Sequence, residues 1–225
     1  MTAAAARQRQ RSIIDVVRTT KPRPRARGHG NSIRIIGGRW RGRRIAFPDV
    51  EGLRPTPDRI RETLFNWLQV PITGARCLDL FAGSGALGLE ALSRGAHSVV
   101  FVEKAPAAAY ALRAQLLRLG AAARAEVREL GAARFLRMPA ELFDVVFLDP
   151  PFGCNALTEY LPMLEAGGWL VPGGLVYLES ERAAGIPRLP AAWALLKSKS
   201  AGEVGYHLVR SATIERAATQ RPTHA

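Results

Sequence analysis

The sequence predicts an α/β fold: a mainly parallel seven-stranded sheet closed by a C-terminal antiparallel hairpin, preceded by a β-hairpin and a helix. From residue 76 onward, short apolar strands alternate with helical segments, which is typical of parallel βαβ units. The segment 143–149 is apolar almost throughout and ends in Asp149, as expected for a strand that is covered on both faces. A glycine-rich stretch, 79–88, joins the first of these strands to the first helix.

The positive charge of the chain is concentrated at its amino end. The formal net charge is +13, and residues 1–44 hold 13 Lys and Arg side chains against a single acid, Asp15. Residues 1–31 are rich in Ala, Arg, Gln and Pro, so we expect a disordered basic arm there. Charge confined to one end indicates a polyanionic partner that binds at that end.

A basic hairpin is expected after the arm. Residues 33–36 and 43–47 flank a glycine-rich tip, GGRWRG at 37–42, and therefore read as two short strands joined by a turn. Trp40 stands among arginines, where its ring could stack on a nucleobase. Alternatively, it could pack on the helix that follows.

The next segment, 57–69, has apolar residues at helical spacing. Thr56 is expected to be the N-cap and Pro57 to occupy the first turn. Arg59 and Arg61 lie near the amino end of this helix, where the helix dipole disfavours positive charge. Their presence hints at a bound anion, although neighbouring acids could also neutralise them.

Strands and helices then alternate along the chain. We expect strands at 76–81, 98–103, 124–128, 143–149 and 174–180, with helices at 86–94, 105–119, 132–138 and 157–165. The segments 193–199 and 204–210 read as the closing antiparallel hairpin.

The two cysteines, Cys77 and Cys154, lack the paired spacing of a zinc site or a disulfide framework. A reducing compartment, the cytoplasm, fits best. No segment approaches the ~20 apolar residues that span a bilayer, and the start lacks the apolar core of a secretory signal. An organellar transit peptide is a weaker reading than a basic arm, because the charge continues into a segment that is expected to fold.

The glycine-rich stretch 79–88 is expected to hold a cofactor. Its glycines let the backbone turn tightly close to a ligand, and Glu103 ends the next strand at the spacing at which an acid meets ribose hydroxyls. Alone, this loop fits NAD and S-adenosylmethionine equally. Asp79 favours the second, because its negative charge suits the cationic methionine portion and is unfavourable beside a pyrophosphate. The DPPF element at 149–152 also favours it, because hydride transfer has no use for such an element.

The DPPF element fits methyl transfer to an exocyclic amine. The Asp149 carboxylate and the Pro150 carbonyl can accept the amino hydrogens and hold the nitrogen in line with the methyl group. Phe152 can stack on a base that is turned out of its surroundings.

Four stretches together resemble one bacterial family: IRIIGG at 33–38, LRPTPDRIRETLFN at 53–66, DLFAGSGALGLE at 79–90 and DPPF at 149–152. They are similar to the small-subunit rRNA guanine-N2 methyltransferases that modify guanine 966 of 16S rRNA. The resemblance covers about 32–210, and its motifs are specific in combination, whereas DPPF alone marks only the broad class of amino-methyltransferases.

The resemblance implies a Rossmann-like class I fold that uses S-adenosylmethionine and no metal. It divides the chain into a basic arm (1–31), an RNA-binding extension (32–70), a methyltransferase domain (71–215) and a tail (216–225). It also implies a monomeric protein that acts on 16S rRNA, within a small subunit or an assembly intermediate, and away from membranes.

The resemblance assigns roles residue by residue. The implied catalytic residues are Asp149, Pro150, Pro151 and Phe152. The implied cofactor residues are Asp79, Phe81, Ala82, Gly83, Ser84, Gly85, Gly88, Glu103, Lys104 and Ala132. The implied RNA-binding residues are Arg39, Trp40, Arg41, Arg43, Arg54, Thr56, Arg59 and Arg61.

The sequence departs from the family at Gly131, where the family usually carries an Asp or Asn that can meet the adenine amino group. Three other functions stay open from the residues. They are an adenine-N6 methyltransferase, a nucleic-acid-binding protein without chemistry, and, more remotely, a carbon-5 methyltransferase that uses Cys154.

Overall fold

The computed structural model describes residues 31–50, 55–153 and 156–212. The expected arm up to residue 30, the tail, Arg54 and Cys154 lie outside these ranges. The strands of the main sheet are β3 (Arg76–Asp79), β4 (Ser98–Val102), β5 (Ala125–Arg128), β6 (Phe143–Leu148), β7 (Leu170–Glu181), β8 (Ala194–Ala201) and β9 (Val204–Arg210).

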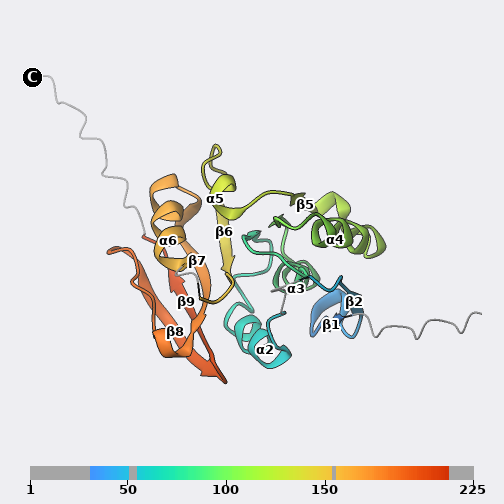
Figure 1. The fold of residues 1–225 in the computed structure, drawn as a ribbon, viewed down its shortest axis with the longest axis horizontal. Helices are drawn as coiled ribbons and strands as arrows, with labels where there is room; N and C mark the ends of the chain where they lie inside the picture. The colour runs from blue at the N-terminus through green and yellow to red at the C-terminus, as the bar shows by residue number, and fades with distance from the viewer. Residues whose placement is uncertain (1–30, 51–54, 154–155, 213–225) are drawn as a thin grey trace, which may run out of the picture. The chain divides into compact units, whose positions relative to one another are not determined.

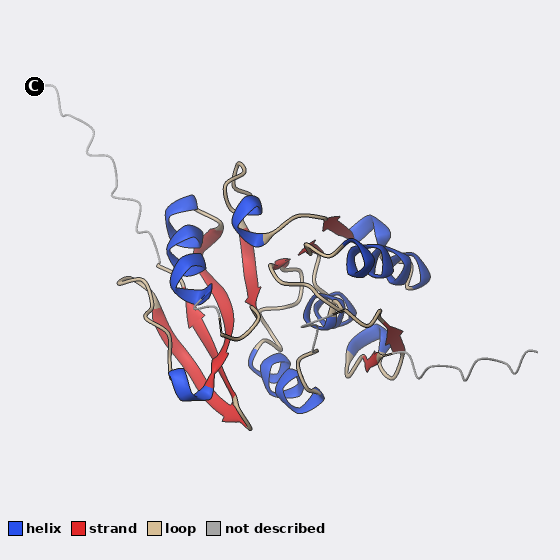
Figure 2. Cartoon of the chain, viewed as in Figure 1, coloured by secondary structure: helices blue, strands red, loops and turns tan. Residues whose placement is uncertain are grey.

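The sheet has the order β5-β4-β3-β6-β7-β9-β8, and its strands are drawn in red in Figure 2. The pairs from β5 to β7 are parallel, whereas β9 runs antiparallel to both β7 and β8. This confirms the predicted mainly parallel sheet of seven strands with its closing hairpin. The chain runs outward from β3 to β5 and then returns to β6, so the topological switch point lies between β3 and β6, where open α/β sheets bind ligands.

Helices cover the two faces of this sheet (Figure 1). Side chains of α2 (Asp58–Trp67), α3 (Ala86–Ser93) and α4 (Pro106–Arg118) join one hydrophobic cluster. Side chains of α5 (Ala132–Phe135) and α6 (Ala156–Gly167) join a second one. Among the described residues, no helix is long and apolar enough to cross a membrane.

The predicted amino-terminal hairpin is present as β1 (Ser32–Arg34) and β2 (Arg44–Ala46), which pair antiparallel. Its inward side chains, Ile33 and Ile45, belong to the same hydrophobic cluster as α3 and α4. The tip lies against the end of α3, where a Cβ on Gly38 would lie 1.9 Å from the Ser93 carbonyl oxygen. Gly38 also has φ 71°, a left-handed conformation that favours glycine.

Helix α2 begins differently from the prediction. Pro57 is its N-cap, and no side chain caps the helix. Thr56 instead turns its hydroxyl toward Asp149, to which it donates a hydrogen bond of 3.0 Å. The prediction of a Thr56 cap was therefore wrong, because a partner distant in sequence competes for the same hydroxyl.

Candidate active site

Asp79 and Asp149 meet at the topological switch point. Asp79 is the last residue of β3, and Asp149 follows the last residue of β6. The two strands are paired, and beyond them the Leu80 N–H donates to the Phe147 carbonyl at 3.1 Å. The fold therefore brings the two predicted loops, 70 positions apart in sequence, to the same edge of the sheet.

Asp79 is buried, and its Oδ2 accepts a hydrogen bond of 3.0 Å from the Gly88 N–H in α3. Burial raises the pKa of Asp79 to about 7; the Gly88 hydrogen bond opposes this shift, and the charges of Asp149 and Glu103 add to it. A cation beside Asp79 would favour the ionised carboxylate. The site is thus suited to a positively charged group.

Glu103 ties the glycine loop to the start of α4. One of its carboxylate oxygens accepts from the Gly83 N–H and the other from the Ala105 N–H, both at 2.7 Å. The loop conformation is therefore fixed by a side chain from the neighbouring strand end. The predicted contact of Glu103 with a ribose stays a prediction.

The glycines of the loop meet two structural requirements, a left-handed backbone and close packing against neighbouring elements. Gly83 and Gly85 have φ of 51° and 78°, in the left-handed region. A Cβ on Gly85 would lie 2.6 Å from Leu112, and one on Gly88 would lie 2.2 Å from Phe101. Gly85 and Gly88 thus let α3 approach α4 and β4 closely. This packing role adds to the tight turn and the ligand approach that the sequence predicted for these glycines.

The remaining predicted cofactor residues surround this loop. Phe81 is half-buried and meets the ring of Tyr160 edge-on, with centroids 5.2 Å apart. Ala82 and Ser84 in the loop and Ala132 at the start of α5 are buried, and Lys104 is exposed.

Gly131 precedes α5 in extended backbone, with φ −75° and ψ 150°, and no side chain caps that helix. A Cβ at this position would meet nothing within 4 Å. There is accordingly open space where the family usually carries Asp or Asn.

The DPPF element follows β6, and Asp149, its first residue, is partly exposed as a whole residue. Pro150 is buried, whereas Pro151 and Phe152 are exposed, the latter to 47%. Burial raises the pKa of Asp149, and the hydrogen bond from Thr56 opposes that shift. An exposed ring three positions after a held carboxylate can stack on a base whose amino group the carboxylate binds.

A second carboxylate, Glu179, lies beside Asp149. In the register of β6 and β7, Leu148 pairs with Leu178, so the next residue of each strand faces the same side of the sheet. Glu179 is buried and accepts a 2.7 Å hydrogen bond from the Tyr177 hydroxyl. Burial, and then the charge of Asp149, raise the pKa of Glu179 to about 8, and hydrogen bonds with Tyr177 and Thr56 oppose that shift, so the Thr56 hydroxyl lies near both carboxyl groups.

Three predicted RNA-binding residues have internal roles instead. Trp40 is 2% exposed, and Arg124 lies over its ring at 5.9 Å. Its backbone N–H donates to Ser93 at the end of α3, so Trp40 has the alternative role, packing inside the protein. Thr56 is buried against Asp149. Arg61 is fully buried, with its Nε donating to the Thr56 carbonyl at 3.1 Å.

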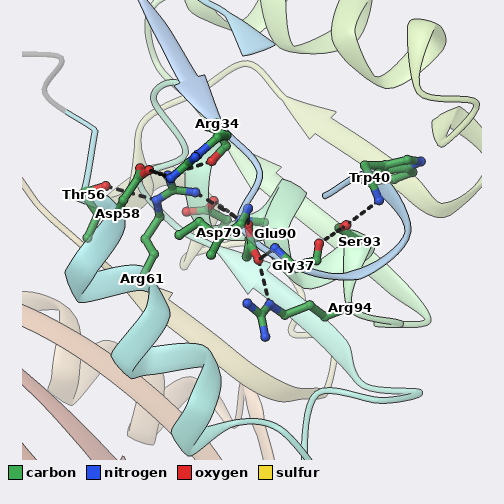
Figure 3. A network of polar contacts seen from close by, with 12 residues as sticks. Arg34, Gly37, Trp40, Thr56, Asp58, Arg61, Asp79, Glu90, Ser93 and Arg94 are labelled. Carbon is green, nitrogen blue, oxygen red and sulfur yellow. Dashed lines mark hydrogen bonds and ion pairs between the residues drawn. The ribbon is translucent and has the colours of Figure 1, made fainter. Parts of the chain in front are cut away.

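Arg61 lies in a buried polar network that Figure 3 shows. A terminal nitrogen of Arg61 donates to the Arg34 carbonyl at 2.9 Å and also bonds Asp58, and the other lies 3.6 Å from Glu90. Glu90 in turn accepts from the Ile36 and Gly37 N–H groups, both at 2.8 Å. The negative partners of Arg61 are therefore Asp58 and Glu90 of the protein itself, and Arg61 needs no bound anion.

Four predicted RNA-binding arginines have exposed side chains. Arg39, Arg41 and Arg43 lie at the tip and in the second half of the hairpin, and Arg59 lies in the first turn of α2.

Comparison with known proteins identifies the family. A family model described as conserved hypothetical protein 95 matches residues 33–210. Ribosomal RNA small subunit methyltransferase D of Escherichia coli (strain K12) is 49% identical over 186 residues, which cover 83% of this chain and 93% of that protein. The chain belongs to the ribosomal RNA small subunit methyltransferase D family.

Further similar proteins support membership of the methyltransferase D family. The Haemophilus influenzae protein of the same name is 44% identical over 191 residues, covering 84% of this chain and 97% of that protein. The solved structure of the Escherichia coli protein yhhF has a TM-score of 0.76 and 46% identity, covering 81% of this chain and 99% of the other. That of HI0767 from Haemophilus influenzae has a TM-score of 0.70 and 42% identity, with the same coverage.

Sequence reasoning about this methyltransferase D family member missed two buried acids, Glu90 and Glu179. Glu90 is the one acid of α3, whose residues are all buried, and Glu179 directly follows the apolar run 175–178 of β7, two residues before the exposed Glu181. Acids are rarely buried without a partner, so each was a detectable signal. Arg61 was detectable as well, because its spacing from Leu64 and Phe65 places it on the apolar face of α2.

Proposed function

We propose that this protein transfers the methyl group of S-adenosylmethionine to the N2 amine of guanine 966 in 16S rRNA. Its class, an S-adenosylmethionine-dependent rRNA methyltransferase, follows from the family. The finer assignment is supported chiefly by one observation: a partly exposed Asp149, followed by an exposed Phe152, lies across the switch point from the buried Asp79 and its glycine loop.

The residues at the end of β3 fit the cofactor. In the described part of the chain, Asp79 forms no ion pair, so its buried carboxylate has no cation of the protein to balance it. The ammonium group of S-adenosylmethionine would supply that charge, and the glycine loop held by Glu103 would support the rest. When bound, the cofactor provides a sulfonium-linked methyl group, which is a strong electrophile.

Asp149 and the Pro150 carbonyl would hold the guanine amine. Hydrogen bonds from the two amino hydrogens orient the nitrogen lone pair toward the methyl group and favour positive charge on that nitrogen. The nitrogen–carbon bond forms as the carbon–sulfur bond breaks, and the sulfur keeps the electron pair as a neutral thioether. The methylated nitrogen then releases one proton, for which the Asp149 carboxylate is the nearest acceptor.

The exposed arginines would bind the RNA backbone. Arg39, Arg41 and Arg43 on the hairpin, with Arg59 on α2, form an RNA-binding set in the same amino-terminal part of the sequence as the charge-rich arm. Replacing the three hairpin arginines with alanine should weaken rRNA binding and reduce the salt slope of log Kd by about 0.9 for each phosphate that the variant no longer neutralises. An unchanged salt slope would show that the RNA binds to a surface other than the hairpin.

We further propose that the protein acts in the cytoplasm as a monomer, on 16S rRNA in a small subunit or an assembly intermediate. Sedimentation of the full chain and methylation of naked rRNA against small subunits test the oligomeric state and the substrate.

The decisive experiment maps the modified nucleotide. rRNA from cells that lack this protein is incubated with the purified enzyme and labelled cofactor, and the product is located by mass spectrometry. We expect one N2-methylguanine at position 966, absent with Asp149→Ala. Label in adenine would support an N6 methyltransferase, and a wild-type rate with Asp149→Ala would remove the mechanism.

A further inference from the structure

We propose that Thr56 and Glu179 are positioning residues for Asp149. Thr56 fixes one oxygen of the Asp149 carboxylate so that the other faces the substrate amine, and Glu179 holds the proton that the two neighbouring carboxyl groups share. This inference rests on the proposed role of Asp149 in methyl transfer.

The hydroxyl of Thr56 is directed by the chain around it. It donates to Asp149 Oδ2 at 3.0 Å, and Thr56 is 5% exposed, so water has little access to that bond. The Thr56 carbonyl accepts from Arg61 Nε at 3.1 Å, which holds the backbone that carries the hydroxyl. Among the hydrogen bonds described for residues 31–50, 55–153 and 156–212, Asp149 uses only Oδ2.

When a hydrogen bond holds one oxygen of a carboxylate, the direction of the second oxygen is fixed as well. An unheld Asp149 could rotate about its last torsion, which has a broad two-fold preference, and present either oxygen at variable angles. In-line transfer requires the amine to be placed to within a fraction of an ångström. Thr56 thus supplies an alignment that the exposed end of the β6 loop lacks on its own.

Glu179 is placed to share a proton with Asp149. Adjacent strands of a sheet lie about 4.8 Å apart, and these two residues follow the paired Leu148 and Leu178. Neither carboxyl group forms an ion pair with a described residue. Two neighbouring acids without a cation, one buried and one partly exposed, do not both ionise readily, so they retain one proton between them.

The surroundings assign that proton to Glu179. The polar groups facing the pair are the Thr56 hydroxyl, the Tyr177 and Tyr206 hydroxyls on β7 and β9, and Asp79 on β3. As a whole residue Glu179 is 3% exposed, whereas Asp149 is partly exposed, and the pKa of Glu179 is raised to about 8 while that of Asp149 is raised to about 6. Burial disfavours the charged form, so the charge resides on Asp149, where the amine binds.

Thr56→Val tests the first half, because valine keeps the shape and removes the hydroxyl. We expect kcat for rRNA methylation to fall about 10- to 100-fold, while the Kd for S-adenosylmethionine measured by calorimetry changes less than about twofold. Thr56→Ser should restore most of kcat. Thr63→Val is the matched control, because within the described ranges the Thr63 hydroxyl bonds only the helix backbone at Arg59. A Thr56→Val enzyme with the kcat of the control overturns this half.

Glu179→Gln tests the second half, because glutamine reproduces the shape of a neutral carboxyl group. We expect the acid limb of the pH profile of kcat to stay in place and the alkaline step, at which the wild-type pair loses its last proton, to disappear. If the acid limb moves down by about one pH unit, Glu179 is ionised beside Asp149 and this half is wrong. A retained alkaline step also overturns it, because the proton then belongs to another group.

The wild-type enzyme is assayed in parallel, which separates this inference from the proposed function. If the wild type methylates a base other than guanine, the proposed substrate is wrong, but the ratio of Thr56→Val to wild type still decides the role of Thr56.

Discussion

Replacing Arg61 with leucine should destabilise the protein strongly, although the new side chain is apolar and buried. The Thr56 and Arg34 carbonyls would lose a charged donor, and Glu90 would lose one of its two arginine partners. Glu90 keeps Arg94, whose Nε lies 2.6 Å away, so its charge is not left alone. Each of these two carbonyls that loses its donor costs about 1–3 kcal/mol, or about 2–6 kcal/mol for both, and Glu90, which keeps Arg94, adds little to that cost.

We therefore expect the free energy of unfolding to fall by about 2–6 kcal/mol. For a domain of this size, each kcal/mol lowers Tm by about 2–4 °C, so the total shift is about 4–24 °C. Thermal and urea unfolding followed by circular dichroism measure both quantities. Arg76→Ala is the control, because Arg76 pairs with Glu141 on the surface, where both side chains are over 40% exposed. Surface pairs contribute less than about 1 kcal/mol. Equal losses in the two variants would refute the reasoning.

Three further predictions concern the cofactor loop and its neighbours. Gly88→Ala should cost about 1–3 kcal/mol of stability, despite the higher helix propensity of alanine, because its Cβ would clash with Phe101; a stability equal to wild type in urea unfolding would contradict this. Because Asp79 has a pKa of about 7, affinity for S-adenosylmethionine should fall up to about tenfold per pH unit below 7, and calorimetry at several pH values measures it. In the cofactor-free protein the folded state binds this proton more tightly, so the contribution of Asp79 to stability is lost as pH rises from about 4 to about 7. Gly131→Asn should change stability by only a few tenths of a kcal/mol, because glycine is already a fair N-cap of α5, but it should tighten cofactor binding, whereas Gly131→Ala should cost about 0.5–1.5 kcal/mol as a poor N-cap and leave the cofactor affinity measured by calorimetry unchanged.

The sequence predicted the sheet well because its signals are local. Each apolar run and each glycine that ends a helix depends on a few neighbouring residues, so β6 and α4 appear within one or two positions of their expected bounds. Larger shifts occur where pairing extends a strand: β7 begins at Leu170, four residues early, because Leu170 pairs with Phe143.

The site was predicted only in part, because its remaining members depend on contacts across the fold. Asp79, Glu103 and Asp149 can be recognised from the sequence, because each is an acid at the end of an apolar strand segment. Thr56 and Arg61, in contrast, look like a helix cap and a surface arginine until β6 and α3 are packed against α2. Local preference favoured those readings, and tertiary partners overrode it.

The amino-terminal hairpin shares a hydrophobic cluster with α3 and α4, which limits where this enzyme can be truncated. Ile33 and Ile45 pack with α3 and α4, and Glu90 holds the backbone of the hairpin from inside α3. A fragment that starts at residue 71 would expose apolar side chains and deprive Glu90 of its contacts with Ile36, Gly37 and Arg61, leaving Arg94, so it should aggregate rather than fold as a catalytic module. Chimeras that graft a new RNA specificity onto this scaffold must therefore exchange the hairpin together with the facing surface of α3.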